Sequence, residues 1–455
     1  MQTPQIQATS IAPGPRGHFL LGHLPERRKD PLNLFVRAMR DYGGVVRMKF
    51  GPKLIHLVND PAGVKHVLQD NAKNYVKGFG YDQLVPLLGA GLLTSEGEFW
   101  RRQRKLAQPA FHRQRIATFA TTMTNATEAM LKTWEPHYVS GTPFDVATEM
   151  MRLTMRIAGE TLLSTDVSQD ADTIGQALGR LIPEANRRIL SLVHLWDKFP
   201  TPRNKRFKKA LADLDRVVMG IIGERRKNKE DKGDLLSMLM SAQDEETGEG
   251  MTDKQLRDEV MTIFLAGHET TANALAWTWY LLSKHPIVER KLLEELATIL
   301  NGRTATFEDV PRLRYTTMVI EETMRLYPPA WVTSRQALED DRVCGFSIPK
   351  DSIVILSSYT AHRNAAHWPN PLGFDPERFA DDKSAARPKY TYFPFSGGPR
   401  QCIGQNFAMM EAVLIVATIA QRYRLELLPG HDVIPEPLIT LRPKNGIQVT
   451  LRRDA

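Results

Sequence analysis

The chain has 455 residues, of which 42% are hydrophobic and 25% are charged, and its formal net charge is +8 at pH 7. These proportions are ordinary for a globular protein and exclude a chain that is disordered as a whole, and no linker-like tract divides it, so we expect one domain over 1–455. Two cysteines, Cys344 and Cys402, exclude a disulfide scaffold and fit a reducing compartment.

The N-terminal segment 1–24 has no apolar run near the roughly 20 residues that cross a bilayer. We therefore expect a soluble protein without a transmembrane anchor. Basic clusters at 202–209 and 224–232 leave a nucleic-acid patch as an alternative, but both are interleaved with apolar residues and acids, as on solvated helix faces. No nucleic-acid partner is expected.

Strand patterns are confined to two regions. Segments 45–51 and 53–60 flank Gly51-Pro52 and predict a hairpin, and 341–358 predicts a second strand pair around Pro349-Lys350. The fold class is therefore mainly α, with a β-rich part at about 40–70, further strands at about 333–360 and a helical remainder.

The clearest helix starts at Thr252, which forms a capping box with Gln255, and continues without proline to Pro286. About 33 residues span roughly 50 Å, and the helix is apolar nearly all round, so most of it must be buried. Gly267, Glu269 and Thr270 interrupt this apolar run. A proton pathway or ligand groove would explain them, and a kink with a satisfied polar pair is an equal alternative.

A second polar pair precedes Pro328-Pro329. Glu322 and Arg325 are three residues apart on one helix face, where an exposed ion pair would be ordinary and weak. Segment 368–382, which contains Arg378, is rich in turns and has no periodicity. Something other than regular structure must hold its side chains.

The segment 393–408 reads FPFSGGPRQCIGQNFA. Its glycines allow close approach to a flat ligand, and Cys402 lies just ahead of a predicted helix at 403–422, whose N-terminus favours a thiolate. The thiolate could be a nucleophile, a zinc ligand or an iron ligand. No CxxC or His/Cys cluster supports zinc, and a single thiolate suffices for iron held in a porphyrin, so the spacing favours haem.

These motifs resemble the cytochrome P450 superfamily. Phe395, Gly398, Arg400, Cys402 and Gly404 match the haem signature FxxGxRxCxG. AGHETT at 266–271, ExxR at 322–325, PERF at 376–379 and WxxxR at 100–104 follow the family's pattern over the length of the chain. The resemblance is to soluble bacterial members that carry AGHETT, a group that includes fatty-acid hydroxylases.

The resemblance implies the P450 fold, with haem b between the long central helix and the Cys-loop helix, and with Cys402 as the iron ligand. Glu322, Arg325 and Arg378 would form a structural lock behind the cysteine loop. Thr270 and Glu269 would be the catalytic acid–alcohol pair that organises proton delivery. The cofactor-binding residues would be Trp100, Arg104, Ala266, Gly267, Arg335, Phe395, Arg400 and Gly404.

The implied activity is monooxygenation, the insertion of one atom of O2 into a lipophilic molecule. Fatty acid is the first choice of substrate, followed by terpenoid, steroid or polyketide. A peroxygenase and a non-catalytic haem-based sensor or lipid binder are the alternatives. The expected pocket residues are Leu84, Leu87, Ala330 and Val332.

Electrons would come from a separate ferredoxin or flavodoxin with its reductase, because no flavin or iron–sulfur segment is expected in this chain and hence no fused reductase. Arg101, Arg102, Lys105 and Arg113 are the cations expected to attract such an acidic partner. A cytoplasmic location in a bacterium is expected.

Overall fold

The computed structural model describes residues 10–78, 80–164, 171–190, 199–228, 231–244 and 246–453. The chain forms two compact units, each built from separate segments of the sequence. Unit 1 comprises Met1–Phe79, Ala330–Gly373 and Ala385–Cys402, and unit 2 comprises Gly80–Pro329, Phe374–Ser384 and Ile403–Ala455. The two units are described separately below.

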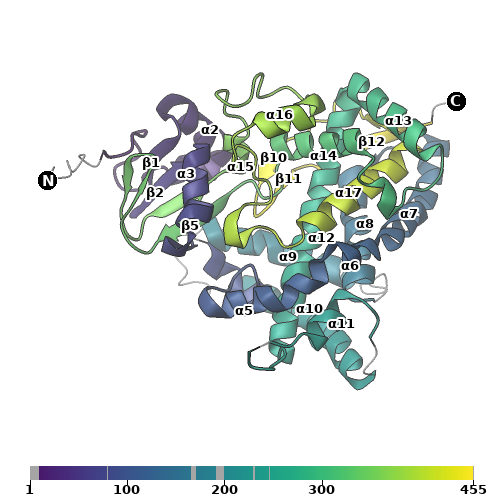
Figure 1. Ribbon diagram of the computed structural model, residues 1–455, viewed down its shortest axis with the longest axis horizontal. Coiled ribbons are helices and arrows are strands. Elements are labelled where there is room, and N and C mark those ends of the chain that lie inside the picture. The colour runs from purple at the N-terminus through teal and green to yellow at the C-terminus, as the bar shows by residue number, and fades with distance from the viewer. Residues whose placement is uncertain are drawn as a thin grey trace. The chain divides into compact units, whose positions relative to one another are not determined.

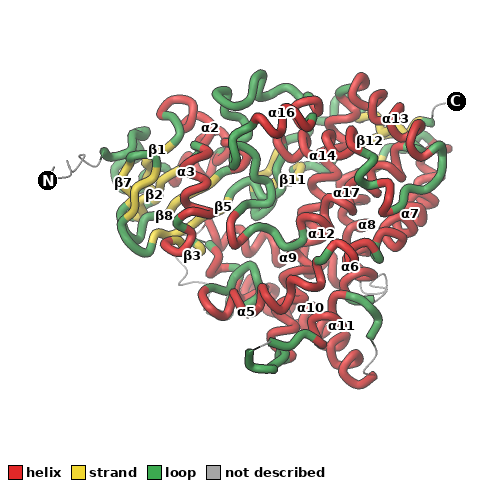
Figure 2. Tube along the Cα trace, in the orientation of Figure 1, coloured by secondary structure: helices red, strands yellow, loops and turns green. Residues whose placement is uncertain are grey.

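Unit 1 is built on a five-stranded sheet in the order β1-β2-β8-β5-β3 (Figure 2). The predicted hairpin is confirmed: β1 and β2 are antiparallel, and Gly51 turns between them with a φ of 59°. The elements are α1 (Leu24–Lys29), α2 (Pro31–Tyr42), β1 (Val45–Phe50), β2 (Lys53–Val58), α3 (Pro61–Lys65), β3 (Tyr75–Lys77), β5 (Thr333–Ala337), β6 (Asp341–Val343), β7 (Phe346–Ile348), β8 (Ile353–Leu356) and α15 (Ser358–Ala361).

The predicted strand pair around Pro349-Lys350 is wrong. The hairpin in this region joins β6 to β7, and Cys344 and Gly345 turn between them with positive φ angles of 49° and 83°. Strand β8 instead pairs in parallel with β2 and antiparallel with β5. All four residues of β8 are buried, as suits a strand inside a sheet, and the turn signal at Pro349 only ends the small hairpin.

Unit 2 is mainly helical (Figure 1). Its elements are α4 (Val85–Leu88), α5 (Gly97–Ala107), α6 (Arg113–Ala117), α7 (Ala120–Ser140), β4 (Phe144–Asp145), α8 (Val146–Leu162), α9 (Ala171–Leu190), α10 (Pro202–Asn228), α11 (Leu235–Ser241), α12 (Asp253–Lys284), α13 (Pro286–Leu300), α14 (Arg314–Leu326), α17 (Gln405–Ala420), β9 (Arg424–Leu427), β10 (Pro435–Pro437), β11 (Leu441–Pro443) and β12 (Gln448–Arg452). The short helix α16 (Asp381–Ala386) crosses the boundary between the two units.

The predicted central helix is α12. It has 32 residues and begins at the capping box of Thr252 and Gln255, both of whose reciprocal hydrogen bonds are present. It ends where Pro286 opens α13, because proline has no N–H to continue the hydrogen-bond ladder. Helix α12 packs against α8, α10, α14 and α17, and most of its side chains are buried. Such a scaffold can hold side chains at fixed positions.

The C-terminal strands were not expected. Strands β9 and β12 pair with each other, β12 also pairs with β4, and β10 forms a hairpin with β11. These strands have two to five residues, and β10 and β11 contain prolines, so their sequences carry little alternating pattern. Among the described residues, no helix combines the length and apolarity that crossing a bilayer requires.

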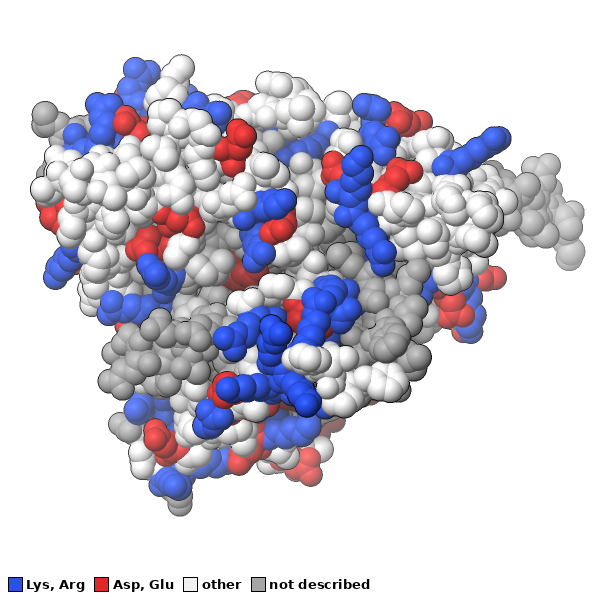
Figure 3. Space-filling model, turned by 180° about the vertical axis from the view of Figure 1, so that it is seen from behind, with Lys and Arg blue, Asp and Glu red and all other residues white. Residues whose placement is uncertain are grey.

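The basic clusters on α10 contain several arginines that are held by carboxylates of the same unit. Arg203 pairs with Glu184, and buried Arg225 pairs with Asp234 at 2.7 Å. Figure 3 shows Lys and Arg side chains interspersed with Asp and Glu over much of the face in view, with one group of cations near its middle. Ion pairs within the chain therefore neutralise part of the positive charge of these basic clusters.

Candidate functional site

The cysteine loop lies in unit 1. The N–H of Cys402 donates to the carbonyl of Phe395 at 3.0 Å, which closes the loop, and the Cys402 side chain is exposed. Gly398 has a φ of 65°, and a Cβ there would lie 1.8 Å from the carbonyl oxygen of Leu68. Only glycine fits at this position. The loop geometry therefore depends on backbone packing as well as on the motif residues.

Tyr390 and His362 support this loop, and neither was predicted. The Tyr390 hydroxyl accepts from the N–H of Gly398 at 3.1 Å and donates to Gln69 Oε1 at 2.9 Å. Fully buried His362 accepts from the N–H of Phe393 through Nε2 at 3.0 Å. A tyrosine 12 residues before a cysteine carries no sequence signal, because the loop that joins them has no fixed period.

The other residues of unit 1 that were predicted to bind haem or substrate differ in how far they are exposed to solvent. Arg335 is buried on β5, and its Nη1 donates to Thr333 Oγ1 at 3.1 Å and to the Ser334 carbonyl at 3.0 Å. Ala330 is exposed, and the half-buried residues are Val332, Phe395 and Arg400.

Helix α12 carries an accessible face within an otherwise buried run. Ala266 is exposed, Gly267 and Thr270 are half-buried, and helical spacing places the three on one side. A Cβ at Gly267 would have no neighbour within 4 Å, so the position beside it is open. The Thr270 hydroxyl donates to the Ala266 carbonyl at 2.6 Å. A ligand on this face would meet backbone and one hydroxyl.

Glu269 is buried and bonds to a different segment. Its Oε1 accepts from the Thr440 hydroxyl at 2.7 Å, and Asn273 Nδ2 donates to the same Thr440 oxygen at 3.2 Å. Burial raises the pKa of Glu269, while the Thr440 hydrogen bond and Arg442 act in the opposite direction. The carboxyl group is thus held by the segment between β10 and β11, whereas Thr270 is bonded to its own helix.

The predicted residues of α5 lie one helical turn apart. Trp100 is buried and Arg104 is half-buried. The neighbouring cations are partly neutralised: Arg101 pairs with Glu98, and Arg102 lies 3.7 Å from carboxylate oxygens of Asp244 and Glu249. Gly404, which precedes α17, has only a Phe111 ring carbon near its Cβ position, at 3.8 Å.

Glu322, Arg325 and Arg378 lie together in unit 2. Arg325 donates twice to the Glu322 carboxylate, at 2.6 and 2.8 Å, and both side chains are fully buried. Arg378 forms an ion pair with Glu322 at 3.3 Å, and the N–H of Asp375 donates to Glu322 Oε1 at 2.9 Å. One carboxylate therefore connects α14 with the short helix Pro376–Phe379, and this buried pair is not the ordinary exposed one.

A second buried carboxyl group, Glu411 on α17, was not predicted. Its Oε2 has no hydrogen-bond partner among the described residues. Burial raises the pKa of Glu411 to about 8, and the nearby Thr271 hydroxyl acts in the opposite direction. The side chain is therefore largely neutral near pH 7, which lowers the cost of keeping it inside the helical core.

Replacing Glu411 by glutamine is expected to change the pH dependence of stability. Between the ordinary pKa of 4.5 and the folded value of about 8, the folded wild-type chain binds a proton that the unfolded chain releases. The wild-type free energy of unfolding should therefore fall as the pH rises through this window, by up to about 5 kcal/mol. Glu411→Gln should lack this fall, whereas Glu294→Gln, at an exposed position, should retain it. The free energy of unfolding is measured with urea at each pH. The same change with pH in Glu411→Gln and in wild type would contradict the assignment.

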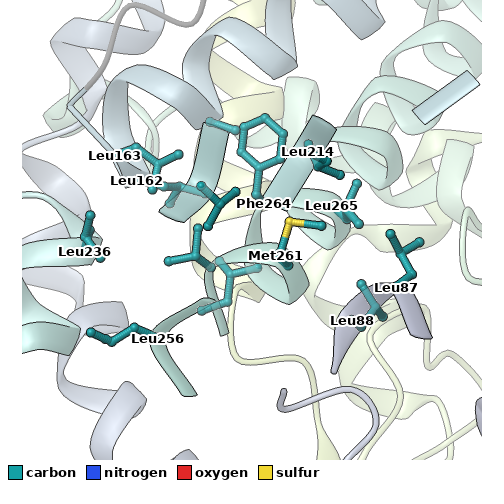
Figure 4. Packing of buried hydrophobic residues seen from close by; sticks show 14 of the residues in the cluster. Leu87, Leu88, Leu162, Leu163, Leu214, Leu236, Leu256, Met261, Phe264 and Leu265 are labelled. Atoms are coloured by element: carbon teal, nitrogen blue, oxygen red, sulfur yellow. The ribbon is translucent and has the colours of Figure 1, made fainter. Parts of the chain in front are cut away.

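Two predicted pocket residues lie in the hydrophobic core of unit 2. Leu84 and Leu87 are buried in a cluster that includes Met261 and Leu265 of α12. Figure 4 shows Leu87 and Leu88 of α4 beside Met261 and Leu265. Their packing against α12 places these leucines next to the helix with the accessible face.

The donor chemistry of Cys402 fits haem. In the described part of the chain, no group of three or more His, Cys, Asp and Glu residues could hold a metal ion. A single exposed cysteine such as Cys402 suits a metal that brings its own equatorial ligands, as iron in a porphyrin does. The open position beside Gly267 also suits a flat ligand that needs close backbone approach.

Comparison with known proteins gives consistent matches over nearly the whole chain. The family model described as Cytochrome P450 matches residues 12–451. Cyclooctatin synthase of Streptomyces melanosporofaciens is 39% identical over 97% of this chain and 96% of its own length. Pentalenene oxygenase of Streptomyces avermitilis is 32% identical over 95% of both chains. The crystal structure of the cytochrome P450DA heme domain superposes with a TM-score of 0.90 at 27% identity, covering 99% of each chain.

Proposed function

This chain belongs to the cytochrome P450 family, and from that premise we propose that it oxygenates a terpenoid, with haem b as cofactor. As a P450 monooxygenase it is an oxidoreductase that incorporates oxygen from O2. The observation that carries the substrate proposal is the similarity over nearly the full chain to cyclooctatin synthase and, at 32% identity, to pentalenene oxygenase. These names favour a terpenoid over the fatty acid that the motifs first indicated.

In this proposal Cys402 provides the thiolate ligand to the iron, and when bound, haem supplies the chemistry of oxygen activation. The exposed thiol and the glycine-dependent loop support this role. Arg104, Arg335 and Arg400, with Trp100, are proposed to bind the haem propionates, because guanidinium groups match carboxylates in a fixed geometry. Glu322 and its two arginines would keep the segment ahead of the loop in place.

Thr270 is proposed to position the water that delivers protons, and Glu269 to supply them. The half-buried Thr270 hydroxyl lies on the accessible face of α12, and burial raises the pKa of Glu269, which favours a carboxyl group able to hold a proton. Thr440 donates to Glu269 Oε1 in this structure, so Oε2 is the oxygen proposed to exchange protons with water.

Replacing Thr270 by alanine is expected to uncouple electron use from product formation. Product formation should fall by about 100-fold, at the lower end of what a positioned proton donor contributes, while peroxide release rises. Thr278→Ala is the matched control, since its hydroxyl makes the same type of bond, to the Ala274 carbonyl at 2.8 Å, but is fully buried. An unchanged amount of product per electron consumed in Thr270→Ala would refute the relay role.

A separate acidic ferredoxin or flavodoxin is proposed as the electron donor. Arg101, Arg102, Lys105 and Arg113 are proposed to attract it, and of these Lys105 and Arg113 are exposed cations on α5 and α6. Reduction by ferredoxin is expected to slow as ionic strength rises, and Lys105→Glu should slow it about tenfold at low salt. Exposed Lys132 on α7 offers a matched control, Lys132→Glu. Equal reduction rates for both variants would contradict this docking surface.

The substrate class is tested by spectral titration of the purified holoenzyme. Cyclic terpene hydrocarbons and terpene alcohols, fatty acids and steroids are added in turn, and displacement of water from the iron is followed by absorption. Terpenoids are expected to give the largest shifts at the lowest concentrations. Tighter binding of fatty acids than of every terpenoid in the panel would overturn the substrate proposal and leave the family assignment untouched.

A further inference from the structure

The N-terminal part of unit 1 presents three consecutive apolar side chains to solvent. Phe19 is 86% exposed, Leu20 is 68% exposed and Leu21 is 44% exposed. Single exposed apolar residues are common on protein surfaces and need no explanation, whereas contiguous ones mark interaction sites. The apolar tip, defined here as residues 19–21, is such a contiguous group.

The apolar tip is held in a fixed turn. His18 and Gly22 exchange backbone hydrogen bonds at 3.0 and 2.8 Å, and the N–H groups of Leu20 and Leu21 donate to His18 Nδ1 at 3.3 and 3.2 Å. Gly22 has a φ of 58°, and a Cβ there would lie 2.2 Å from the Lys49 carbonyl oxygen. The turn is therefore tied to β1, and little backbone conformational entropy is lost when it binds a surface.

Several cations lie beside the apolar tip or near it in the sequence. Exposed Arg16 precedes it, and an open cavity of about 370 Å³ beside it is lined by Phe19, Arg47 and Lys49 among others. Helix α1, which follows directly, carries Arg27, Arg28 and Lys29 in its last turn. The acid of α1, Glu26, pairs with Arg37 at 3.0 Å. The local charge is positive.

From this combination we infer that the apolar tip docks on an anionic phospholipid bilayer. Phe19, Leu20 and Leu21 enter the boundary between headgroups and acyl chains, and lipid phosphates lie near Arg47 and Lys49. Apolar side chains at the tip of a rigid turn with cations at its base match the two layers of a bilayer interface, apolar below and anionic above. This interface lies outside the proposed haem and substrate residues.

The test is a flotation assay of the full-length holoenzyme with two vesicle types, one of phosphatidylcholine alone and one of equal parts phosphatidylcholine and phosphatidylglycerol. Wild type should float with the anionic vesicles. Phe19→Ser/Leu20→Ser should lower the partition coefficient by on the order of 100-fold, about tenfold or more for each lost side chain. Arg16→Gln/Lys49→Gln should lower it by about fivefold per cation, on anionic vesicles only.

The control variant Val139→Ser/Leu372→Ser removes two side chains that are 76% and 73% exposed elsewhere, and it should float as wild type does. Circular dichroism and haem content should match wild type in every variant. Equal flotation of wild type and Phe19→Ser/Leu20→Ser would overturn the inference. So would sedimentation of wild type as a dimer that Phe19→Ser/Leu20→Ser converts to monomers, because the apolar tip would then be a self-association surface.

Discussion

Replacing Cys402 by serine is expected to abolish oxygenation and the red-shifted absorption of the reduced carbonyl adduct. A serine hydroxyl is a hard, weakly acidic donor and cannot replace a soft thiolate on iron. The loop should keep its shape in the variant, because the hydrogen bond that closes it is donated by the backbone N–H of residue 402 and not by its side chain. Absorption spectra of the reduced carbonyl adduct and product analysis measure the two effects.

The matched control is Cys344→Ser. Cys344 lies in the turn between β6 and β7, and burial together with the nearby Asp60 carboxylate raises the pKa of its thiol to about 11. Such a thiol is protonated at neutral pH and is a poor metal ligand. This variant should oxygenate at the wild-type rate. If Cys402→Ser kept the thiolate-type spectrum of the reduced carbonyl adduct and Cys344→Ser lost it, Cys344 and not Cys402 would be the iron ligand.

Replacing Glu322 by glutamine is expected to destabilise the fold by about 3–5 kcal/mol, the cost of leaving a buried charge without its partner. Glutamine keeps the shape of the side chain, but it leaves the fully buried Arg325 and the nearly buried Arg378 without their shared carboxylate. Urea unfolding followed by circular dichroism measures the loss, and the ratio of haem to protein absorbance reports whether the cysteine loop is affected as well.

Glu294→Gln provides the comparison, because Glu294 pairs with Arg290 at an exposed position and should contribute less than about 1 kcal/mol. If Glu322→Gln does not accumulate as folded protein, Glu322→Asp retains the charge and shortens the side chain, and an intermediate loss is expected. If Glu322→Gln and Glu294→Gln unfolded at the same urea concentration, the buried ion pair would not stabilise this unit.

Local signals in the sequence explain which parts of the fold were predictable. The bounds of α12 followed from the Thr252 capping box and from Pro286, and the first hairpin followed from Gly51-Pro52. The cysteine motif and its helix also lie within one short segment. Each of these features depends on residues that are near one another in the chain, so one sequence suffices to find them.

Long-range contacts were not predictable. The segment between β10 and β11 reaches Glu269 through Thr440, 171 residues away. Tyr390 reaches Gln69 over 321 residues, and β8 joins β2 rather than its neighbours in the chain. Glu411 occupies one position in an almost wholly apolar helix, and only its burial distinguishes it from a surface glutamate. Such contacts are set by the packing of distant segments and leave no periodic trace in the sequence.

The bonds between the β10–β11 hairpin and α12 bear on any attempt to re-engineer this protein. Besides the Thr440 contacts, Trp277 Nε1 donates to the Leu441 carbonyl at 3.0 Å, and the N–H of Leu441 donates to the Pro329 carbonyl at 2.9 Å. A library that varies 438–441 to widen product scope would therefore also perturb the carboxyl group at 269. Screening for new regiochemistry there should record the electrons consumed per molecule of product, because this ratio separates slow variants from variants that waste reducing equivalents.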